Sequence, residues 1–373
     1  MRFADIPFQE EAKERLRQIA DSDRIPHAIL LEGPSGSAKF ALARAFAQYM
    51  HCTDRHDGDS CGKCPACIQH KAHQHIDTLY SFPYVKKASG GNTICDDYRG
   101  EFTEYIDEWP WMDFDRWPQC LGDSNTQPQI FVDEAAEITR RLAYTSHSSR
   151  HKIVLLWLPE RLKEEAANKL LKVVEEPFAD TVFVMSSDNS REILPTIYSR
   201  VQRIKVKRYD SSEIEQFLRD KGTPDETAAE IAAISNGDLN RALKLLETKD
   251  SDDRHLEWFI ELMRLAYQRD IAALKAWSQK VAGEKRESLI RFLEYCCRML
   301  RENFILNLQN PGLNVMTSAE RKFSVNFARF INERNVLRIF DEFSTAITDI
   351  RANVNAKIVM FDLAISVILL LKQ

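Results

Sequence analysis

Four cysteines near the start of the chain have a spacing that suits a metal ion. They are separated by eight, two and two residues: Cys52, Cys61, Cys64 and Cys67. Cysteines two residues apart can turn back onto one ion, and four thiolates in a tetrahedron are typical ligands of structural zinc. An iron–sulfur cluster also binds closely spaced cysteines, but the long first gap fits zinc better. A closed site of four ligands leaves no open position for chemistry, so we expect zinc to hold a module at about residues 50–75 together.

Histidines are unusually frequent around these cysteines. Each could replace a thiolate or support the ligands through hydrogen bonds. The five are His51, His56, His70, His73 and His75. We expect the ligand set itself to be the four cysteines.

A glycine-rich turn precedes the cysteines and could bind phosphate. Residues 33–40 read Gly-Pro-Ser-Gly-Ser-Ala-Lys-Phe, against the phosphate-loop pattern Gly-x4-Gly-Lys-Ser/Thr. Gly33 and Lys39 are kept and could bind the phosphates of a nucleotide. Ala38 replaces the second glycine, and Phe40 replaces the hydroxyl that would hold magnesium. The sequence therefore predicts the turn of a former nucleotide site, in which ATP binding is doubtful.

An ATP-hydrolysing site also needs acidic residues at the end of a neighbouring strand, for magnesium and the attacking water. Asp133 and Glu134 follow one short apolar run. Residues 152–158, Lys-Ile-Val-Leu-Leu-Trp-Leu, form a second candidate strand, in which Trp157 and Leu158 occupy the acidic positions. The order of motifs described below favours the second strand, and with it a site that does not hydrolyse ATP.

The elements that position these residues alternate between strand and helix. Strands are expected at 25–32, 152–158, 181–186 and 201–206, and a strand followed by a helix at 130–143. Helices are expected between the strands, among them 163–176 and 190–199, which predicts a mostly parallel α/β sheet. Beyond about residue 208 only helical patterns remain. We expect three short helices over 211–247 and long helices over 253–373.

Residues 80–128 break the alternation. They are rich in glycine, proline, aspartate and aromatic residues, and we expect an irregular insertion. Its acidic, tryptophan-rich part, residues 107–117, could be a partner surface or could pack on its own domain. The composition favours neither.

Composition excludes several classes of protein. The 373 residues carry 51 basic and 56 acidic side chains, a net charge of −5, whereas a protein that holds DNA alone usually has a basic excess. The sequence contains no run of eighteen apolar residues, so no membrane span is expected. The N-terminus lacks the apolar core of a signal peptide, and eight cysteines without such a signal favour a reducing compartment. We expect a cytoplasmic protein.

Three segments occur in the order of a known family. Residues 167–177 read Ala-Asn-Lys-Leu-Leu-Lys-Val-Val-Glu-Glu-Pro, residues 181–187 read Thr-Val-Phe-Val-Met-Ser-Ser, and residues 193–201 read Ile-Leu-Pro-Thr-Ile-Tyr-Ser-Arg-Val. Together with the phosphate loop and the cysteines, they resemble the clamp-loader branch of the AAA+ proteins, over about residues 8–245 without the insertion. The family's acidic strand lies just before the Ala-Asn helix, where residues 152–158 stand.

The resemblance implies an architecture of three domains. The first is an AAA+ α/β domain with a P-loop-like parallel sheet over 1–207, containing the zinc module and, at about 80–128, the insertion. A small helical lid domain follows at 208–250. The last, at 251–373, is an all-α domain that forms a collar in the family.

The resemblance also implies roles for single residues. The arginine of the Ser-Arg segment, here Arg200, reaches in this family into the ATP site of a neighbouring subunit as an arginine finger. A guanidinium placed there stabilises the charge of the transition state. The alternative is that Arg200 only meets the last carbonyls of its helix. Arg241 corresponds to a second sensor arginine, and Asp188 or Asn189 to a first sensor.

The function implied is that of a non-hydrolysing structural subunit of the bacterial DNA polymerase III clamp loader. Such a subunit sits in a hetero-pentamer with motor subunits and a delta subunit, which opens the sliding clamp and places it on primed DNA. Two alternatives stay open. One is an active AAA+ ATPase that uses Asp133 and Glu134, and the other is a zinc-containing DNA-binding protein.

Overall fold

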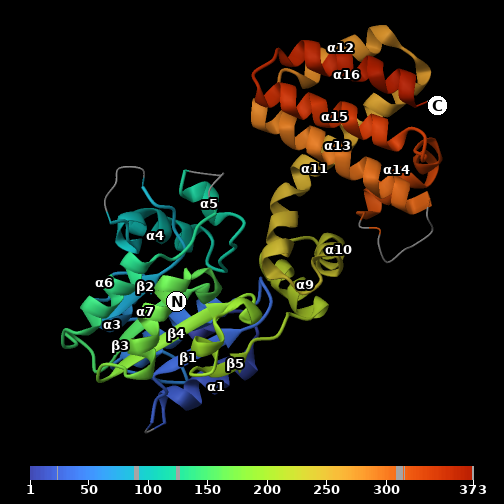
Figure 1. Cartoon of the computed structure of the whole chain (residues 1–373). Helices are drawn as coiled ribbons and strands as arrows, with labels where there is room; N and C mark the ends of the chain where they lie inside the picture. The colour runs from blue at the N-terminus through green and yellow to red at the C-terminus, as the bar shows by residue number, and fades with distance from the viewer. Residues whose placement is uncertain (23, 88–91, 123–126, 308–313, 315, 372–373) are drawn as a thin grey trace. The chain divides into compact units, whose positions relative to one another are not determined.

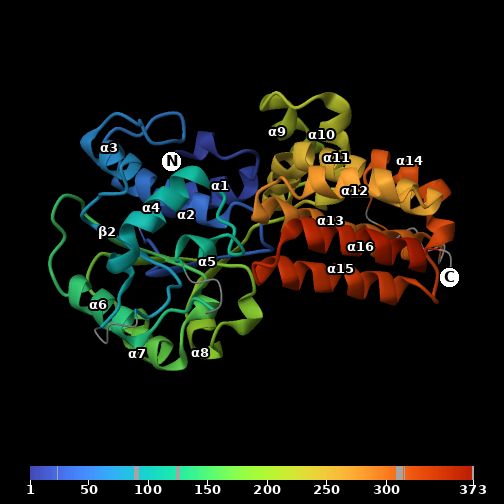
Figure 2. The same cartoon turned by 90° about the horizontal axis from the view of Figure 1, so that it is seen from above.

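A five-stranded sheet lies at the centre of the first of two compact units, Met1–Leu243 and Lys244–Gln373 (Figures 1 and 2). The computed structural model describes residues 1–371 except 23, 88–91, 123–126, 308–313 and 315, and omits the side chains of 248–253 and 287. The strands are β1 (Ala28–Glu32), β2 (Thr78–Ser81), β3 (Lys152–Trp157), β4 (Thr181–Ser187) and β5 (Gln202–Lys205). All neighbouring pairs are parallel, in the order β2-β3-β4-β1-β5.

Helices cover this sheet, which explains why its central strands are buried throughout and mostly apolar. Every residue of β1 and β4 is buried, as expected where both faces of a parallel sheet are covered. The α-helices of the first unit are α1 (Glu10–Ala20), α2 (Lys39–His51), α3 (Pro65–Lys71), α4 (Arg99–Glu108), α5 (Trp117–Cys120), α6 (Val132–Leu142), α7 (Glu164–Glu175), α8 (Pro195–Tyr198), α9 (Ser211–Asp220) and α10 (Asp225–Ser235). Short 3-10 turns are η1 (Phe3–Asp5), η2 (Cys95–Tyr98), η3 (Pro159–Arg161) and η4 (Ser190–Glu192).

The second unit is helical, as the sequence predicts. It contains α12 (Ile271–Val281), α13 (Arg286–Asn307), α14 (Ser318–Phe327), η6 (Ala328–Phe330), α15 (Val336–Arg351) and α16 (Ala356–Leu370). One apolar core, which includes Phe259, Phe292 and Phe343, joins these helices. Within the described residues, no helix combines the length and apolarity needed to cross a bilayer.

The α/β sheet followed by helices is confirmed, but several boundaries differ from the prediction. The third short helix expected before residue 247 is the start of α11 (Leu239–Gln268), which has 30 residues and crosses between the two units. The helix expected at 190–199 is reduced to η4 and the single turn α8. Ile130, expected in a strand, forms only an isolated bridge with Leu162.

The insertion at 80–128 is more ordered than expected. It contains η2, α4 and α5, and its chain leaves the sheet at the end of β2. Trp117 is fully buried, and its indole N–H donates to the Pro83 carbonyl at 2.6 Å. Trp109 and Trp111 are buried as well. The tryptophan-rich part therefore packs within its own unit.

Candidate functional site

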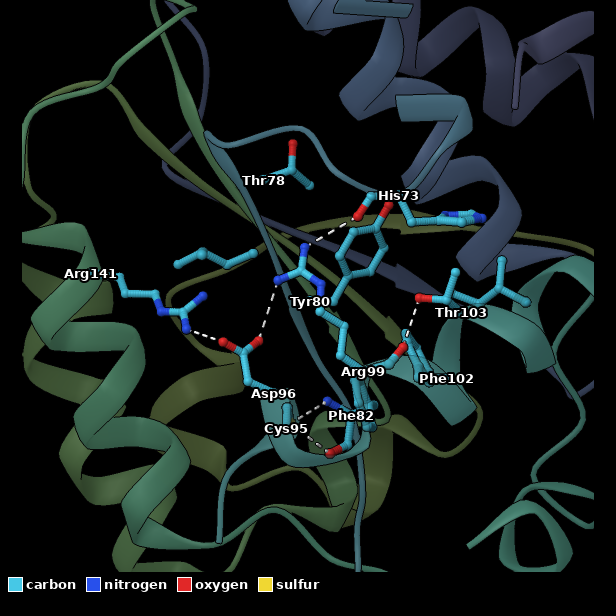
Figure 3. Close-up of a pocket in the computed structure, with 12 residues that line it drawn as sticks. His73, Thr78, Tyr80, Phe82, Cys95, Asp96, Arg99, Phe102, Thr103 and Arg141 are labelled. Carbon is cyan, nitrogen blue, oxygen red and sulfur yellow. Dashed lines mark hydrogen bonds and ion pairs between the residues drawn. The ribbon is translucent and has the colours of Figure 1, made fainter. Parts of the chain in front are cut away.

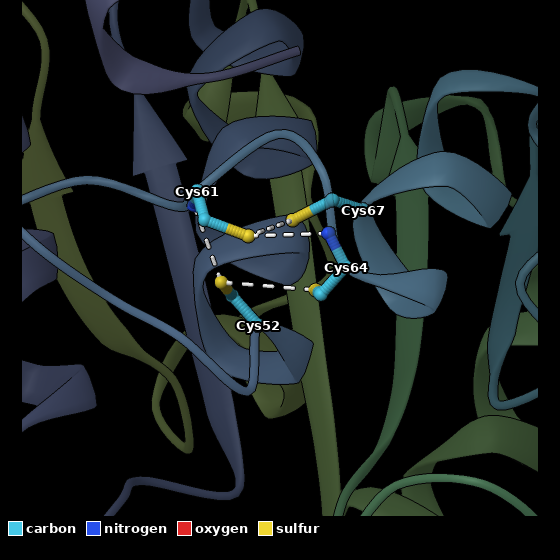
Figure 4. A group of neighbouring side chains, drawn as sticks. All are labelled: Cys52, Cys61, Cys64 and Cys67. Atoms are coloured by element: carbon cyan, nitrogen blue, oxygen red, sulfur yellow. Dashed lines mark hydrogen bonds between the residues drawn. The ribbon is translucent and has the colours of Figure 1, made fainter.

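The four cysteines come together at one point (Figure 4). Cys52 follows the end of α2, Cys61 lies in the next loop, and Cys64 and Cys67 lie at the start of α3. All four sulfur atoms lie within 4.8 Å of one another. The Sγ atoms of Cys61 and Cys67 are 3.9 Å apart, and those of Cys52 and Cys64 are 4.0 Å apart.

These separations match a single tetrahedral ion. Zinc–sulfur bonds of about 2.3 Å place the sulfurs of a tetrahedron about 3.8 Å apart. Backbone N–H groups also point at the sulfurs. The amide of residue 61 donates to the Cys52 sulfur at 3.3 Å, and those of residues 63 and 64 donate to the Cys61 sulfur at 3.4 and 3.2 Å. The thiolate is the form of cysteine that binds metals, and these N–H groups can stay bonded to the sulfurs in that form.

Three of the neighbouring histidines form a separate buried stack. The Nε2 of His51 lies 2.9 Å from the His151 carbonyl oxygen, which only accepts, so Nε2 carries the proton. The Nδ1 of His51 therefore accepts from the Nε2 of His70, 2.9 Å away. Both rings lie near the face of His75, with centroids 4.1 and 4.6 Å from its own.

The three imidazole rings of this stack are packed together and neutral. Burial, and then the adjacent His75, lowers the pKa of His51 to about 3, and burial also lowers the pKa values of His70 and His75. The face of the His75 ring lies against the other two rings. Its ring nitrogens form hydrogen bonds instead with the amide of Asp77 and the hydroxyl of Ser149. The stack thus joins α2, α3 and the next loop behind the cysteines.

The other two histidines have carboxylate neighbours. His73 meets Asp107 at 2.8 Å, and His56 meets Asp57 at 3.3 Å. Neither belongs to the four-sulfur group.

The lysine of the phosphate loop forms an ion pair and hydrogen bonds within the chain. Lys39 is 5% exposed. Its ammonium lies 2.8 Å from Asp188 Oδ1 and 3.1 Å from the Ser37 hydroxyl, and it also bonds the Pro34 carbonyl. Asp188 directly follows β4, which lies beside β1 in the sheet. A phosphate would have to displace this carboxylate to reach the lysine.

The loop glycines are fixed by close neighbours. A Cβ at Gly33 would lie 2.2 Å from the Val206 carbonyl oxygen. Gly36 has a φ of +72°, and a Cβ there would lie 1.9 Å from Asp238 Oδ1. The amide of Leu239 donates to the Gly36 carbonyl at 3.2 Å. The start of α11 therefore lies directly on the loop.

Aromatic rings occupy the two positions where magnesium-binding side chains would stand. Phe40 and Trp157 are buried, with ring centroids 6.3 Å apart. The insertion adds further rings to this cluster. Those within 6.3 Å of Trp157 are Phe102, Tyr105, Phe114 and Trp117.

The competing acidic pair lies in the first turn of α6. Glu134 is buried and accepts from the Cys95 amide at 2.8 Å, and burial raises the pKa of its carboxyl group to about 7. Asp133 faces Lys86 at 3.6 Å. Among the described residues, neither carboxylate has a recorded bond to Lys39.

A small hollow in the insertion is too small for a substrate. Its volume is about 20 Å³, enough for one water molecule. Tyr80, Phe82 and Phe102 line it, and Asp96 lies between Arg99 and Arg141, to both of which it is paired (Figure 3). This segment therefore serves packing.

Two contacts join the insertion to the helices that follow the sheet. Trp111 packs edge-on against Phe217 of α9, with centroids 5.9 Å apart. The Asn240 side chain donates to the Met112 carbonyl at 3.0 Å. We call these contacts and the Leu239–Gly36 bond the lid clamp. Sequence patterns did not indicate it.

Arg200 lies just after α8 and is 40% exposed. Its Nε lies 2.7 Å from Glu175 Oε1, at the end of α7. Its Nη1 donates to the Thr196 carbonyl at 2.9 Å and to the Ser199 hydroxyl at 3.2 Å. The guanidinium is thus oriented at the surface and also meets its own helix. Arg241 is exposed on α11.

The sequence is similar to subunits of DNA polymerase III. A profile of the family described as DNA polymerase III, delta subunit, matches residues 8–210. The delta-prime subunits of Haemophilus influenzae and Pseudomonas aeruginosa are 27% and 29% identical over 242 and 248 residues, 65% of this chain in each case. The Bacillus subtilis tau subunit is 24% identical over 256 residues, which cover 66% of this chain and 37% of tau. The matches span 61% and 62% of the two delta-prime subunits.

Solved structures give weaker likenesses. A Thermotoga maritima protein related to the gamma subunit aligns with a TM-score of 0.38 at 17% identity, covering 96% of this chain and 99% of its own. Thermotoga maritima RuvB aligns with a TM-score of 0.37 at 13% identity, covering 66% and 63%.

The parallel sheet, the altered phosphate loop and the ordered motifs define a clamp-loader protein of the AAA+ class. The family profile covers more than half of the chain. The chain belongs to the DNA polymerase III delta-prime subunit family.

Proposed function

We propose that this chain is a non-hydrolysing structural subunit of the DNA polymerase III clamp loader. It joins the motor subunits and the delta subunit in a cytoplasmic hetero-pentamer that places the sliding clamp on primed DNA. Residues 208–250 act as its lid and residues 251–373 as its collar domain. The similarity to delta-prime and tau subunits supports this assembly.

The filled nucleotide site is the observation that carries the proposal. The Lys39 ammonium is neutralised by Asp188, and Phe40 and Trp157 stand where magnesium would be held. Magnesium and a free lysine are both needed to stabilise charge during phosphoryl transfer. The chain therefore leaves ATP turnover to its neighbours.

Zinc is the metal proposed for the four cysteines. A set of four sulfurs with tetrahedral spacing suits zinc, and no position is left for a substrate. The ion joins the end of α2, the following loop and α3.

Arg200 is proposed to act in the ATP site of a neighbouring motor subunit. Its exposure and its fixed orientation support this role. Glu175, Thr196 and Ser199 restrict the guanidinium before a phosphate arrives, which lowers the entropy cost of placing it.

The test is ATP turnover by a reconstituted complex that contains Arg200→Ala. Arginine fingers contribute about 10³-fold or more to phosphoryl transfer, so we expect turnover to be lost at the one adjoining site and total turnover to fall. Arg203→Ala, an exposed arginine on β5, is the matched control. Unchanged turnover with Arg200→Ala in an intact complex would refute the role in trans.

The two alternative functions fit the site and the charge of the chain less well. Asp133 and Glu134 belong to α6 and are held by Lys86 and by the Cys95 amide. A net charge of −5 does not favour a chain that binds DNA alone.

A further inference from the structure

A groove in the second unit combines aromatic walls with a cationic rim. It has a volume of about 340 Å³ and is formed by α11, α14, η6 and Leu371. This volume is at the lower end of the range for small-ligand pockets, and it admits one or two side chains.

The floor and walls of the groove are apolar. Met263 and Phe327 are buried in the floor, and Tyr267, 50% exposed, forms one wall. The Tyr267 and Phe330 rings lie 5.1 Å apart, and Phe323 stacks on Phe327 at 4.9 Å. The unit's core includes Phe327 and packs against Phe323 and Phe330, so an inserted side chain would meet a largely preformed surface.

The rim carries positive charge. Arg264, Lys322 and Arg329 are exposed there, and among the described residues that line the groove none is acidic. Within the described part of the chain, none of the three forms an ion pair with a carboxylate. The chain as a whole has an acidic excess, so such a group of cations is not explained by composition.

We propose that this groove binds a short acidic peptide segment of a partner protein. One aromatic or aliphatic side chain enters the groove, and flanking carboxylates meet Arg264, Lys322 and Arg329. Buried anchors of this kind carry most of the affinity of an interface, while rim charges set specificity. The proposal does not depend on the ATP site or on Arg200.

Single-stranded nucleic acid fits the groove less well. Such strands bind along a cationic track with a row of open aromatic faces on which successive bases stack. Here Tyr267 is half exposed, but Phe327 is only 7% exposed and lies in the floor. A groove of this volume with three cations around it matches one inserted side chain and its acidic neighbours.

The test is fluorescence anisotropy with the full-length chain. The probe is a labelled twelve-residue peptide with glutamates around a central Phe-Leu pair. Two control peptides replace Phe-Leu by Ala-Ala or the glutamates by lysines. The protein variants are Tyr267→Ala and the double reversal Lys322→Glu with Arg329→Glu, compared with a double reversal at exposed lysines elsewhere, Lys275→Glu with Lys357→Glu.

We expect the probe peptide to bind the natural chain saturably, and the binding to weaken as salt is added. Its affinity should fall at least about tenfold in both groove variants and stay unchanged in the control reversal. Binding of the Ala-Ala or lysine peptide as strong as that of the probe would refute the proposal. Displacement of the probe by single-stranded DNA at equal concentration would also refute it. A third refuting result is a groove filled by a second copy of the chain, detected as a dimer that dissociates in the Tyr267→Ala variant. Circular dichroism of each variant verifies folding.

Discussion

Lys39 matches the lysine of a phosphate-binding pattern, but its ammonium group is paired with a carboxylate of the same chain, that of Asp188. Its spacing from Gly33 made it recognisable in the sequence. The partner, Asp188, could be placed near it only once the strand order was known, because β4 lies beside β1 in the sheet although it is distant in the chain. The four cysteines were predictable for the opposite reason: their ligand spacing is local.

Removing Asp188 should destabilise the fold without restoring nucleotide binding. Asp188→Ala leaves a buried ammonium without its carboxylate, and we expect a loss of about 1–3 kcal/mol in the free energy of unfolding, measured with urea. Lys39→Met in the same chain should recover part of this loss. Glu11→Ala, which breaks the exposed Lys207 pair, is the control and should cost under about 0.5 kcal/mol. Tight calorimetric binding of Mg-ATP by the natural chain would contradict the filled-site interpretation, and tight binding by Asp188→Ala alone would show that Phe40 and Trp157 do not block the site.

Glu134 should make stability depend on pH. Its folded pKa of about 7 lies above the ordinary 4.5. Between these values the folded state keeps a proton that the unfolded state has lost, so this group's contribution to stability is lost as pH rises. Glu134→Gln keeps an oxygen for the Cys95 amide but carries no charge. Its stability relative to the natural chain should rise by about 1–3 kcal/mol between pH 5 and pH 8, and parallel pH curves would exclude the effect.

At the scale of elements, the sequence predicted apolar strands better than aromatic segments. β1, β3 and β4 are continuous apolar runs and were expected. β2 was missed because it has four residues and lies at a sheet edge. α4 and α5 were missed because Gly100 and Pro118 are of residue types that are typical of turns and loops. Tertiary packing of Phe102, Tyr105 and Trp117 decides their structure instead.

Loss of the metal should affect the cysteine module before the sheet. Cys61→Ser removes one of four ligands, and we expect zinc content per chain to fall from one to near zero by elemental analysis. Amide hydrogen exchange should rise over residues 50–75 and stay unchanged in β4. Cys120→Ser, an exposed cysteine outside the cluster, is the control. Full zinc retention in Cys61→Ser would show that Cys61 is not a ligand.

Weakening the lid clamp should free the helices after the sheet. Trp111→Ala removes the contact with Phe217, and we expect faster amide exchange in α9 and α10, with β1 unchanged. Adding Mg-ATP should leave exchange in the natural chain the same. Tyr144→Ala, at an exposed aromatic residue, is the control. If α9 and α10 stay equally protected in Trp111→Ala, the clamp does not hold them.

At the scale of the whole molecule, the prediction for Arg200 has a second readout. If the finger acts in trans, loading of a labelled clamp onto primed DNA should fall together with ATP turnover in the Arg200→Ala complex. The order of motifs led to this prediction from the sequence alone. The contact of Arg200 with Glu175 was not, because it joins the ends of two helices that only the fold brings together.

The lid clamp has a consequence for how the molecule responds to its surroundings. A ligand shifts a conformational equilibrium only by its difference in affinity for the two states. In this chain, the contacts of the lid clamp hold the helices after the sheet and need no ligand. Changes in ATP or ADP concentration should therefore not move these helices relative to the sheet. If the chain joins a clamp loader as proposed, we expect the first unit to keep one shape while neighbouring subunits hydrolyse ATP, and to serve as the fixed surface against which they move.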